Sequence, residues 1–208
     1  MAHEIFEQIV EEYLTHQGYF VQHNVKFKPS SRDPDYVADK DRVNSDIDVL
    51  AYNPRLVGRP DCVLAVNVKS WQAGFDIRQE IRKIEANKLV RGKDSTLKFR
   101  ELTIPKWAKA YRETIQHRTQ SQKFTHMLAV TRLVGKGTRS MWENHPKLTA
   151  LMGGNPLRVI TLTEMVEDIE DQLTHTLAPT DLGRMLQLFL AAGLRTKRAT
   201  PVSTPVSQ

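Results

Sequence analysis

The chain has 208 residues, of which 40% are hydrophobic and 26% are charged, and its mean hydropathy is −0.45. This composition predicts a soluble protein with one compact domain, and no apolar run reaches the roughly 18 residues that a membrane-spanning helix needs. A single cysteine, Cys62, excludes a disulfide framework and a cysteine-rich zinc site. Together with an N-terminus that lacks a signal-peptide pattern, it favours a cytoplasmic location.

The charge is distributed unevenly along the chain. The net charge is +6 overall, but residues 1–77 carry −4, residues 78–123 carry +8 and residues 124–208 carry +2. An acidic part suited to metal ligands therefore precedes a strongly basic part. Clustered Lys and Arg side chains are typical of surfaces that bind polyanions, although a basic helix can also be simply a solvated one.

The first third of the chain predicts a helix followed by strands. Apolar residues recur at helical spacing over residues 3–17, and Gly18 ends the helix. Residues 28–44 form a polar loop. Because the linker before the third strand is short and rich in turn residues, the second and third strands are expected to form a hairpin. The predicted strands cover residues 19–27, 46–52 and 62–69.

The remaining chain alternates helices and strands, so the predicted fold class is α/β, with a small mixed central sheet flanked by helices. One domain is expected over residues 1–195, followed by a disordered Thr-, Pro- and Ser-rich tail over residues 196–208. Helices are predicted over 76–91, over 106–118 after Pro105, from the N-cap Thr163 to about 177, and from Thr180 or Asp181 to about 194, with strands over 126–133 and 157–162.

Polar side chains interrupt the apolar pattern of the second and third strands. Because side chains alternate between the faces of a strand, Asp46 and Asp48 are expected on one face and Ile47 and Val49 on the other.

By the same alternation, Asn67 and Lys69 share a face at the end of the third strand. In a hairpin, Asp48 lies near this pair. Carboxylates beside a lysine suit a hard divalent cation, which polarises a phosphate and lowers the pKa of a bound water.

The order of these residues resembles that of the PD-(D/E)XK nucleases, in which an Asp on one strand is followed on the next by acid-X-Lys. Here the corresponding residues are Asp48 and Asn67-Val68-Lys69. Within that superfamily, the chain is most similar to the Mrr-like restriction endonucleases. Their first helix carries a Phe-Glu pair and ends in Gly-Tyr, as do Phe6-Glu7 and Gly18-Tyr19 here, and their motif has a neutral Gln where this chain has Asn67.

The resemblance implies a restriction-endonuclease-like fold and a DNA endonuclease that depends on Mg²⁺ or Mn²⁺. It assigns metal binding to Glu7, Asp48 and the backbone carbonyl of Val68, and the positioning of the attacking water to Lys69. Asn67 completes or tunes the site. The auxiliary candidates are Asp46 and Gln72.

Asn67 stands where an acid is usual, so an alternative stays open: a catalytically inactive nucleic-acid-binding or assembly module on the same fold. A third alternative is a helix-rich interaction protein in which the motif is incidental. The expected partner is nucleic acid, most simply DNA, and not a membrane. With no separate recognition domain visible, a homodimer or a partner subunit is expected to supply specificity. The predicted phosphate contacts are Arg78, Arg82, Lys83, Lys88, Arg91, Lys106, Lys109 and Arg112.

Overall fold

The computed structural model describes residues 4–86, 89–90, 93–94, 98–173, 176–178 and 180–194, so the predicted tail lies outside the described residues. A mixed five-stranded sheet in the order β1-β2-β3-β6-β7 forms the centre, which confirms the predicted α/β class. The first three strands pair antiparallel, and β3, β6 and β7 pair parallel. The strands are β1 Phe20–Phe27, β2 Ser45–Tyr52, β3 Val63–Lys69, β6 Thr125–Val130 and β7 Leu157–Thr161.

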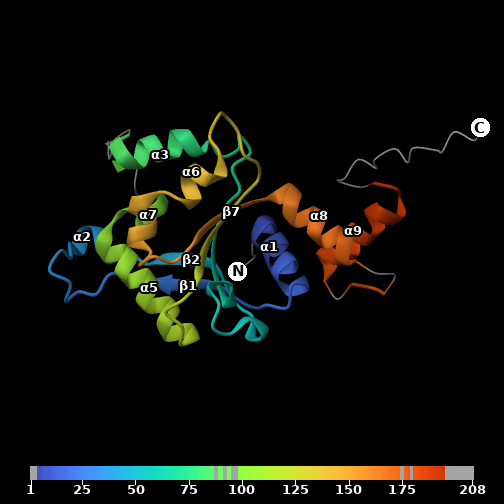
Figure 1. Ribbon diagram of the computed structural model, residues 1–208, viewed down its shortest axis with the longest axis horizontal. Coiled ribbons are helices and arrows are strands. Elements are labelled where there is room, and N and C mark those ends of the chain that lie inside the picture. The colour runs from blue at the N-terminus through green and yellow to red at the C-terminus, as the bar shows by residue number, and fades with distance from the viewer. Residues whose placement is uncertain are drawn as a thin grey trace, which may run out of the picture.

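Helices cover both faces of the sheet, as Figure 1 shows. On one face, α1 (Ile5–His16), α8 (Leu162–Gln172) and α9 (Asp181–Ala191) enclose an apolar cluster that includes Leu14 and Ile169. We call this cluster the α1-side core. The opposite cluster, the α5-side core, contains Trp107 and Trp142. Its helices are α3 (Ile77–Ala86), α4 (Arg100–Thr103), α5 (Pro105–Thr119), α6 (Arg139–Glu143) and α7 (Pro146–Leu151).

Several element boundaries differ from the prediction. The helix expected over 76–91 ends at Ala86, and a small hairpin of β4 (Leu89–Val90) and β5 (Lys93–Asp94) follows. Helix α8 begins two residues earlier than expected, because Thr161 and Glu164 form a reciprocal capping box. The short helices α4, α6 and α7 were not predicted, nor were the two 3-10 turns, Pro54–Leu56 and Pro60–Cys62, between β2 and β3.

The second strand changes faces along its length. Ile47 packs in the α5-side core, whereas Val49 packs in the α1-side core, so the expectation that they share a face was wrong. The cause is a local bend. Asn24 of β1 has a positive φ of 52° and lies at the level of Asp48, between the paired residues on either side. A left-handed residue breaks the strict alternation of a strand and re-aims its neighbours.

The predicted loop 28–44 is anchored by one buried acid. Asp41, at the end of the short helix α2 (Ala38–Asp41), accepts hydrogen bonds from Lys106 Nζ at 2.6 Å, Trp107 Nε1 at 3.1 Å and Val37 N–H at 2.7 Å. Burial raises the pKa of its carboxyl, but these hydrogen bonds outweigh burial and bring the pKa below its ordinary value.

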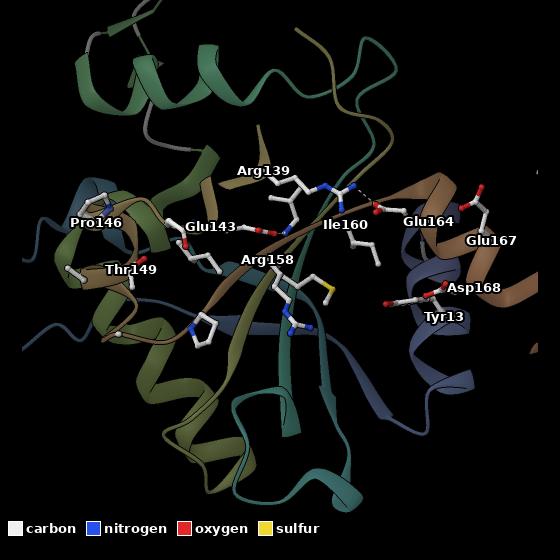
Figure 2. A pocket seen from close by; sticks show the side chains of 17 residues that line it. Tyr13, Arg139, Glu143, Pro146, Thr149, Arg158, Ile160, Glu164, Glu167 and Asp168 are labelled. Carbon is white, nitrogen blue, oxygen red and sulfur yellow. Dashed lines mark hydrogen bonds and ion pairs between the residues drawn. The ribbon is translucent and has the colours of Figure 1, made fainter. Parts of the chain in front are cut away.

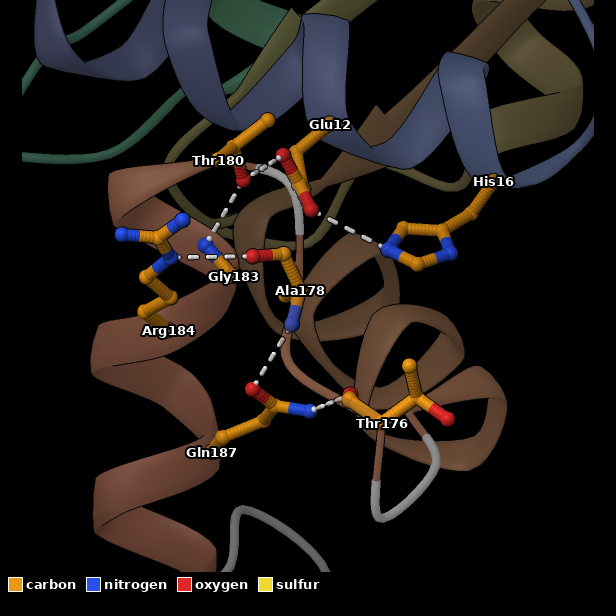
Figure 3. A network of polar contacts seen from close by, with 8 residues as sticks. All are labelled: Glu12, His16, Thr176, Ala178, Thr180, Gly183, Arg184 and Gln187. Atoms are coloured by element: carbon orange, nitrogen blue, oxygen red, sulfur yellow. Dashed lines mark hydrogen bonds and ion pairs between the residues drawn. The ribbon is translucent and has the colours of Figure 1, made fainter.

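The last helix is held to the first by a polar network, drawn in Figure 3. Glu12 of α1 is only 3% exposed and accepts hydrogen bonds from Thr180 and His16. Thr180 also caps α9 through Gly183 N–H at 3.0 Å. A β-carbon at Gly183 would lie 2.7 Å from Glu12 Oε1, so glycine permits this close approach. No helix among the described residues has the length and apolarity to cross a membrane.

Replacing Asp41 by Ala is expected to lower the free energy of unfolding by about 3 kcal/mol, because the ammonium of Lys106 would lose its buried partner. Urea denaturation at pH 7 measures the effect. Asp39→Ala, on the exposed side of the same short helix, is the matched control and is expected to change stability by less than about 0.5 kcal/mol. Equal stabilities for both variants would contradict the anchoring role of Asp41.

Candidate active site

Strands β2 and β3 separate at Asp48. Their antiparallel pairing runs from Tyr52 opposite Val63 to Val49 opposite Val66 and goes no further. At the next position, Asp48 Oδ2 accepts a hydrogen bond from Val68 N–H at 2.6 Å. The Asp48 carboxylate thus accepts a hydrogen bond from β3 just beyond the point where the backbone pairing of β2 and β3 ends.

Charged groups from three separate elements act on Asp48. Burial is the largest influence and raises the pKa of its carboxyl, the Lys69 ammonium and the Val68 N–H lower it, and the carboxylates of Glu7 and Glu101 raise it again. The resulting pKa is about 6. Glu7 lies on α1, Lys69 on β3 and Glu101 on α4, so the fold brings the charges of two predicted site residues, and of one unpredicted residue, to bear on the carboxyl group of Asp48 in β2.

Asn67 lies inside a buried polar cluster. Only 4% of the residue is exposed, and its Oδ1 accepts a hydrogen bond from Tyr111 OH at 3.3 Å. Its Nδ2 donates to Glu101 Oε1 at 3.3 Å. His126, which is fully buried, places Nε2 at 3.8 Å from the same Glu101 oxygen.

Glu101 was missed by the sequence reasoning because it sits in the most basic part of the chain, where an isolated acid suggests a solvated surface. The signal that would have identified it is the presence of apolar residues close to it on both sides in the sequence. Phe99, which precedes the short helix α4, and Leu102 within it are both fully buried and flank Glu101 in the sequence.

Lys69 borders this cluster from the end of β3. The side chain is half-buried, and its Nζ lies 5.9 Å from the centroid of the Phe99 ring. Phe99 belongs to the α5-side core, so Lys69 and Asn67 point to the same side of the sheet, as predicted. Lys98 extends the rim, with its Nζ 4.5 Å from the ring centroid of Trp71.

The auxiliary candidates have other surroundings. Asp46 forms an ion pair with Lys26 across β1 and β2 at 2.7 Å. Gln72 is exposed, and its backbone carbonyl accepts a hydrogen bond from Arg132 at 3.4 Å. Neither is among the groups that act on Asp48. For Val68, the observed contact with Asp48 is through its N–H.

The predicted phosphate contacts divide into exposed and engaged side chains. Arg78 and Arg82 of α3 and Lys109 of α5 are exposed. Lys106 forms an ion pair with Asp41, and Arg112 donates a hydrogen bond to the Leu151 carbonyl at 2.5 Å, so both side chains make contacts within the folded protein.

The three remaining members of the predicted set are Lys83, Lys88 and Arg91. Lys83 is half-buried and pairs with Glu80 at 2.5 Å on the same helix. Lys88 and Arg91 lie outside the described residues. Among the described members of the predicted set, the exposed side chains Arg78, Arg82 and Lys109 lie on α3 and α5.

The donor types at the site fit a hard dication. Magnesium and manganese prefer carboxylate oxygens, and the predicted residues Glu7 and Asp48 are the ones that would hold such an ion. Burial is the main cause of the raised pKa of Asp48, and the carboxylates of Glu7 and Glu101 add to it; a bound dication would favour the ionised form of Asp48. Across the part of the chain that is described, no three His, Cys, Asp or Glu side chains already form a cluster that could hold a metal.

A second concave feature lies away from these residues. A cleft of about 1060 Å³ runs along the edge strand β7, between α6 and α7 on one side and α1 and α8 on the other (Figure 2). Glu143 accepts a hydrogen bond from Val159 N–H, and Glu164 from Thr161 N–H, both at 2.9 Å. These carboxylates occupy backbone donors of the edge strand and so protect it from pairing with another chain.

No protein-family model, curated protein or solved structure matches this chain. The likeness to the PD-(D/E)XK nucleases therefore stays a prediction from the order of the motifs. The observed mixed sheet confirms the α/β class of the predicted fold. The residues around Asp48 are the basis for inferring a function.

In metal-free buffer, Asp48→Asn is expected to stabilise the protein by about 2 kcal/mol at pH 8, allowing for partial exposure of the site. The pKa of Asp48 is raised from 3.8 to about 6, so its contribution to stability is present below pH 3.8 and is lost as the pH rises through 6. The gain should vanish near pH 4. Urea denaturation at both pH values measures it, with Asp39→Asn as control; a variant no more stable than wild type at pH 8 would contradict the assigned pKa.

Proposed function

We propose that the protein is a nuclease that hydrolyses DNA with Mg²⁺ or Mn²⁺, on a restriction-endonuclease-like fold. The observation that carries the proposal is the convergence of charges from Glu7, Asp48 and Lys69 where β2 and β3 part, with the pKa of Asp48 at about 6. A strongly perturbed carboxyl group among charges from distant elements is characteristic of functional sites. The strand order, an antiparallel hairpin extended by parallel strands, supports the fold that the motifs imply.

The roles of the side chains follow from their charges and positions. Glu7 and Asp48 hold the cation, which when bound supplies a polarised phosphate and an acidified water. Lys69 approaches from the α5 side, where its ammonium orients the attacking water and faces the negative charge that develops on the phosphate. The hydrogen bond from Val68 N–H keeps the Asp48 carboxylate in place while the site fills and empties.

Exposed cations of α3 and α5 supply the contacts to the polyanion. Arg78, Arg82 and Lys109 are free to meet phosphates, and Lys98 with Trp71 adds a cation and an aromatic face at the rim near Lys69. Such contacts bind any sequence and weaken as salt rises.

A second candidate function is supported by the surroundings of Asn67. Both ends of its amide are hydrogen-bonded inside the protein, which is the arrangement of a structural residue. A nucleic-acid-binding module without catalysis would show DNA affinity but no Mg²⁺ or Mn²⁺ binding. Calorimetric titration with Mn²⁺ therefore discriminates between the two functions.

Lys69→Ala and Asp48→Ala are each expected to reduce plasmid nicking in Mg²⁺ or Mn²⁺ by about 100-fold or more, since each removes a group that acts on the reacting phosphate or its cation. Lys26→Ala, on the exposed side of the neighbouring strand, is the control and should retain full activity. Nicking that survives both site substitutions would reject this mechanism.

Arg78→Ala combined with Arg82→Ala is expected to weaken binding to a short DNA duplex and to reduce the slope of log K against log salt by about 2, one for each phosphate that the variant no longer neutralises. Fluorescence anisotropy in EDTA, which prevents cleavage, measures both quantities. Arg59→Ala should leave them unchanged, because Arg59 already pairs with Asp61 at 2.6 Å. An unaltered slope in the double variant would remove α3 from the DNA-binding surface.

A further inference from the structure

Glu101 is a buried acid without a basic partner of fixed charge. It is 3% exposed, and among the described residues no Lys or Arg lies within ion-pair distance of its carboxylate. Its described contacts are Asn67 Nδ2 at 3.3 Å and His126 Nε2 at 3.8 Å. Removing a carboxylate from water is expensive unless a charge compensates it, so the burial of Glu101 calls for an explanation beyond packing.

The position of Glu101 supplies that explanation. It contacts Asn67, the residue that occupies the place of the acid in the acid-X-Lys pattern, and its charge is one of those that raise the pKa of Asp48. The carboxylate missing from β3 is thus present one hydrogen bond away, on α4.

The contacts of Asn67 fit the role of a support. Its Oδ1 accepts from Tyr111 OH, and its Nδ2 donates to Glu101, so the amide links a buried tyrosine to the acid and fixes the direction of the carboxylate. Tyr111 and His126 are both buried, and their ring centroids lie 5.8 Å apart in the same cluster. A rigid second layer of this kind positions a metal ligand.

We propose that Glu101 is the third acidic ligand of the site, that Asn67 positions it, and that the cation is held by carboxylates from α1, β2 and α4. This inference rests on the proposed function. It differs from the motif-based assignment, in which Asn67 itself completes the site.

A purely structural role for Glu101 makes a different prediction. If it only anchors α4 to Asn67, glutamine serves equally well, because Gln Oε1 still accepts the hydrogen bond from Asn67 Nδ2 and the side-chain volume is almost unchanged. Glu101→Gln therefore removes the charge and leaves the anchor, and cation binding separates the two roles.

The experiment is calorimetric titration of the full chain with Mn²⁺ at pH 8, without DNA. Wild type is expected to bind, and Glu101→Gln to bind at least about tenfold more weakly. Glu113→Gln, an exposed acid on α5, is the matched control and should bind as wild type does. Wild-type affinity in Glu101→Gln, with binding weakened in Asp48→Asn, would overturn this inference and leave the proposed function standing.

A charge-swap variant guards against misfolding of the single substitution. Asn67→Asp with Glu101→Gln returns the carboxylate to β3, keeps the net charge and preserves a hydrogen bond between the two side chains. Its Mn²⁺ affinity is expected to recover to within about tenfold of wild type. A folded swap variant that binds no better than Glu101→Gln would overturn the placement of this carboxylate at the metal, and a wild-type chain that binds no Mn²⁺ would overturn both proposals.

Discussion

The hydrogen bond between the Asp48 carboxylate and Val68 N–H defines the geometry on which the site depends. It forms where β2 leaves β3, at the level where Asn24 bends β1 and β2 from one core to the other. An undistorted strand would continue the ladder and direct its side chains alternately into two apolar layers. The bend instead leaves a carboxyl group between the layers, within reach of charges from both α1 and α4.

Two aspartates, the buried Asp41 and the partly buried Asp48, show how the environment sets the pKa of an acid. Asp41 has a lysine, an indole N–H and a backbone N–H as donors, so its pKa is low and its charge supports the fold. Asp48 has one backbone donor and one lysine, opposed by burial and by two other carboxylates, so its pKa is high. Ionising Asp48 in the folded protein therefore lowers the free energy of unfolding, whereas ionising Asp41 raises it.

The cations in the basic middle of the chain lie in two kinds of surroundings. Lys106 neutralises a buried acid and Arg112 caps a backbone carbonyl, so part of the charge excess stabilises the layer of helices over the α5-side core. Arg78, Arg82 and Lys109 remain exposed. Composition alone cannot distinguish these surroundings, because a cation paired with a distant acid and a cation in water are identical in the sequence.

The sequence by itself determined the local and periodic features: the order of the main elements, the β2–β3 hairpin and the shared face of Asn67 and Lys69. These follow from alternation and from turn residues, which act over a few positions. Only the tertiary structure decided the switch of β2 between cores, the structural use of Lys106 and the arrival of Glu101 beside Asn67. Each depends on contacts between residues far apart in the chain, which no local pattern records.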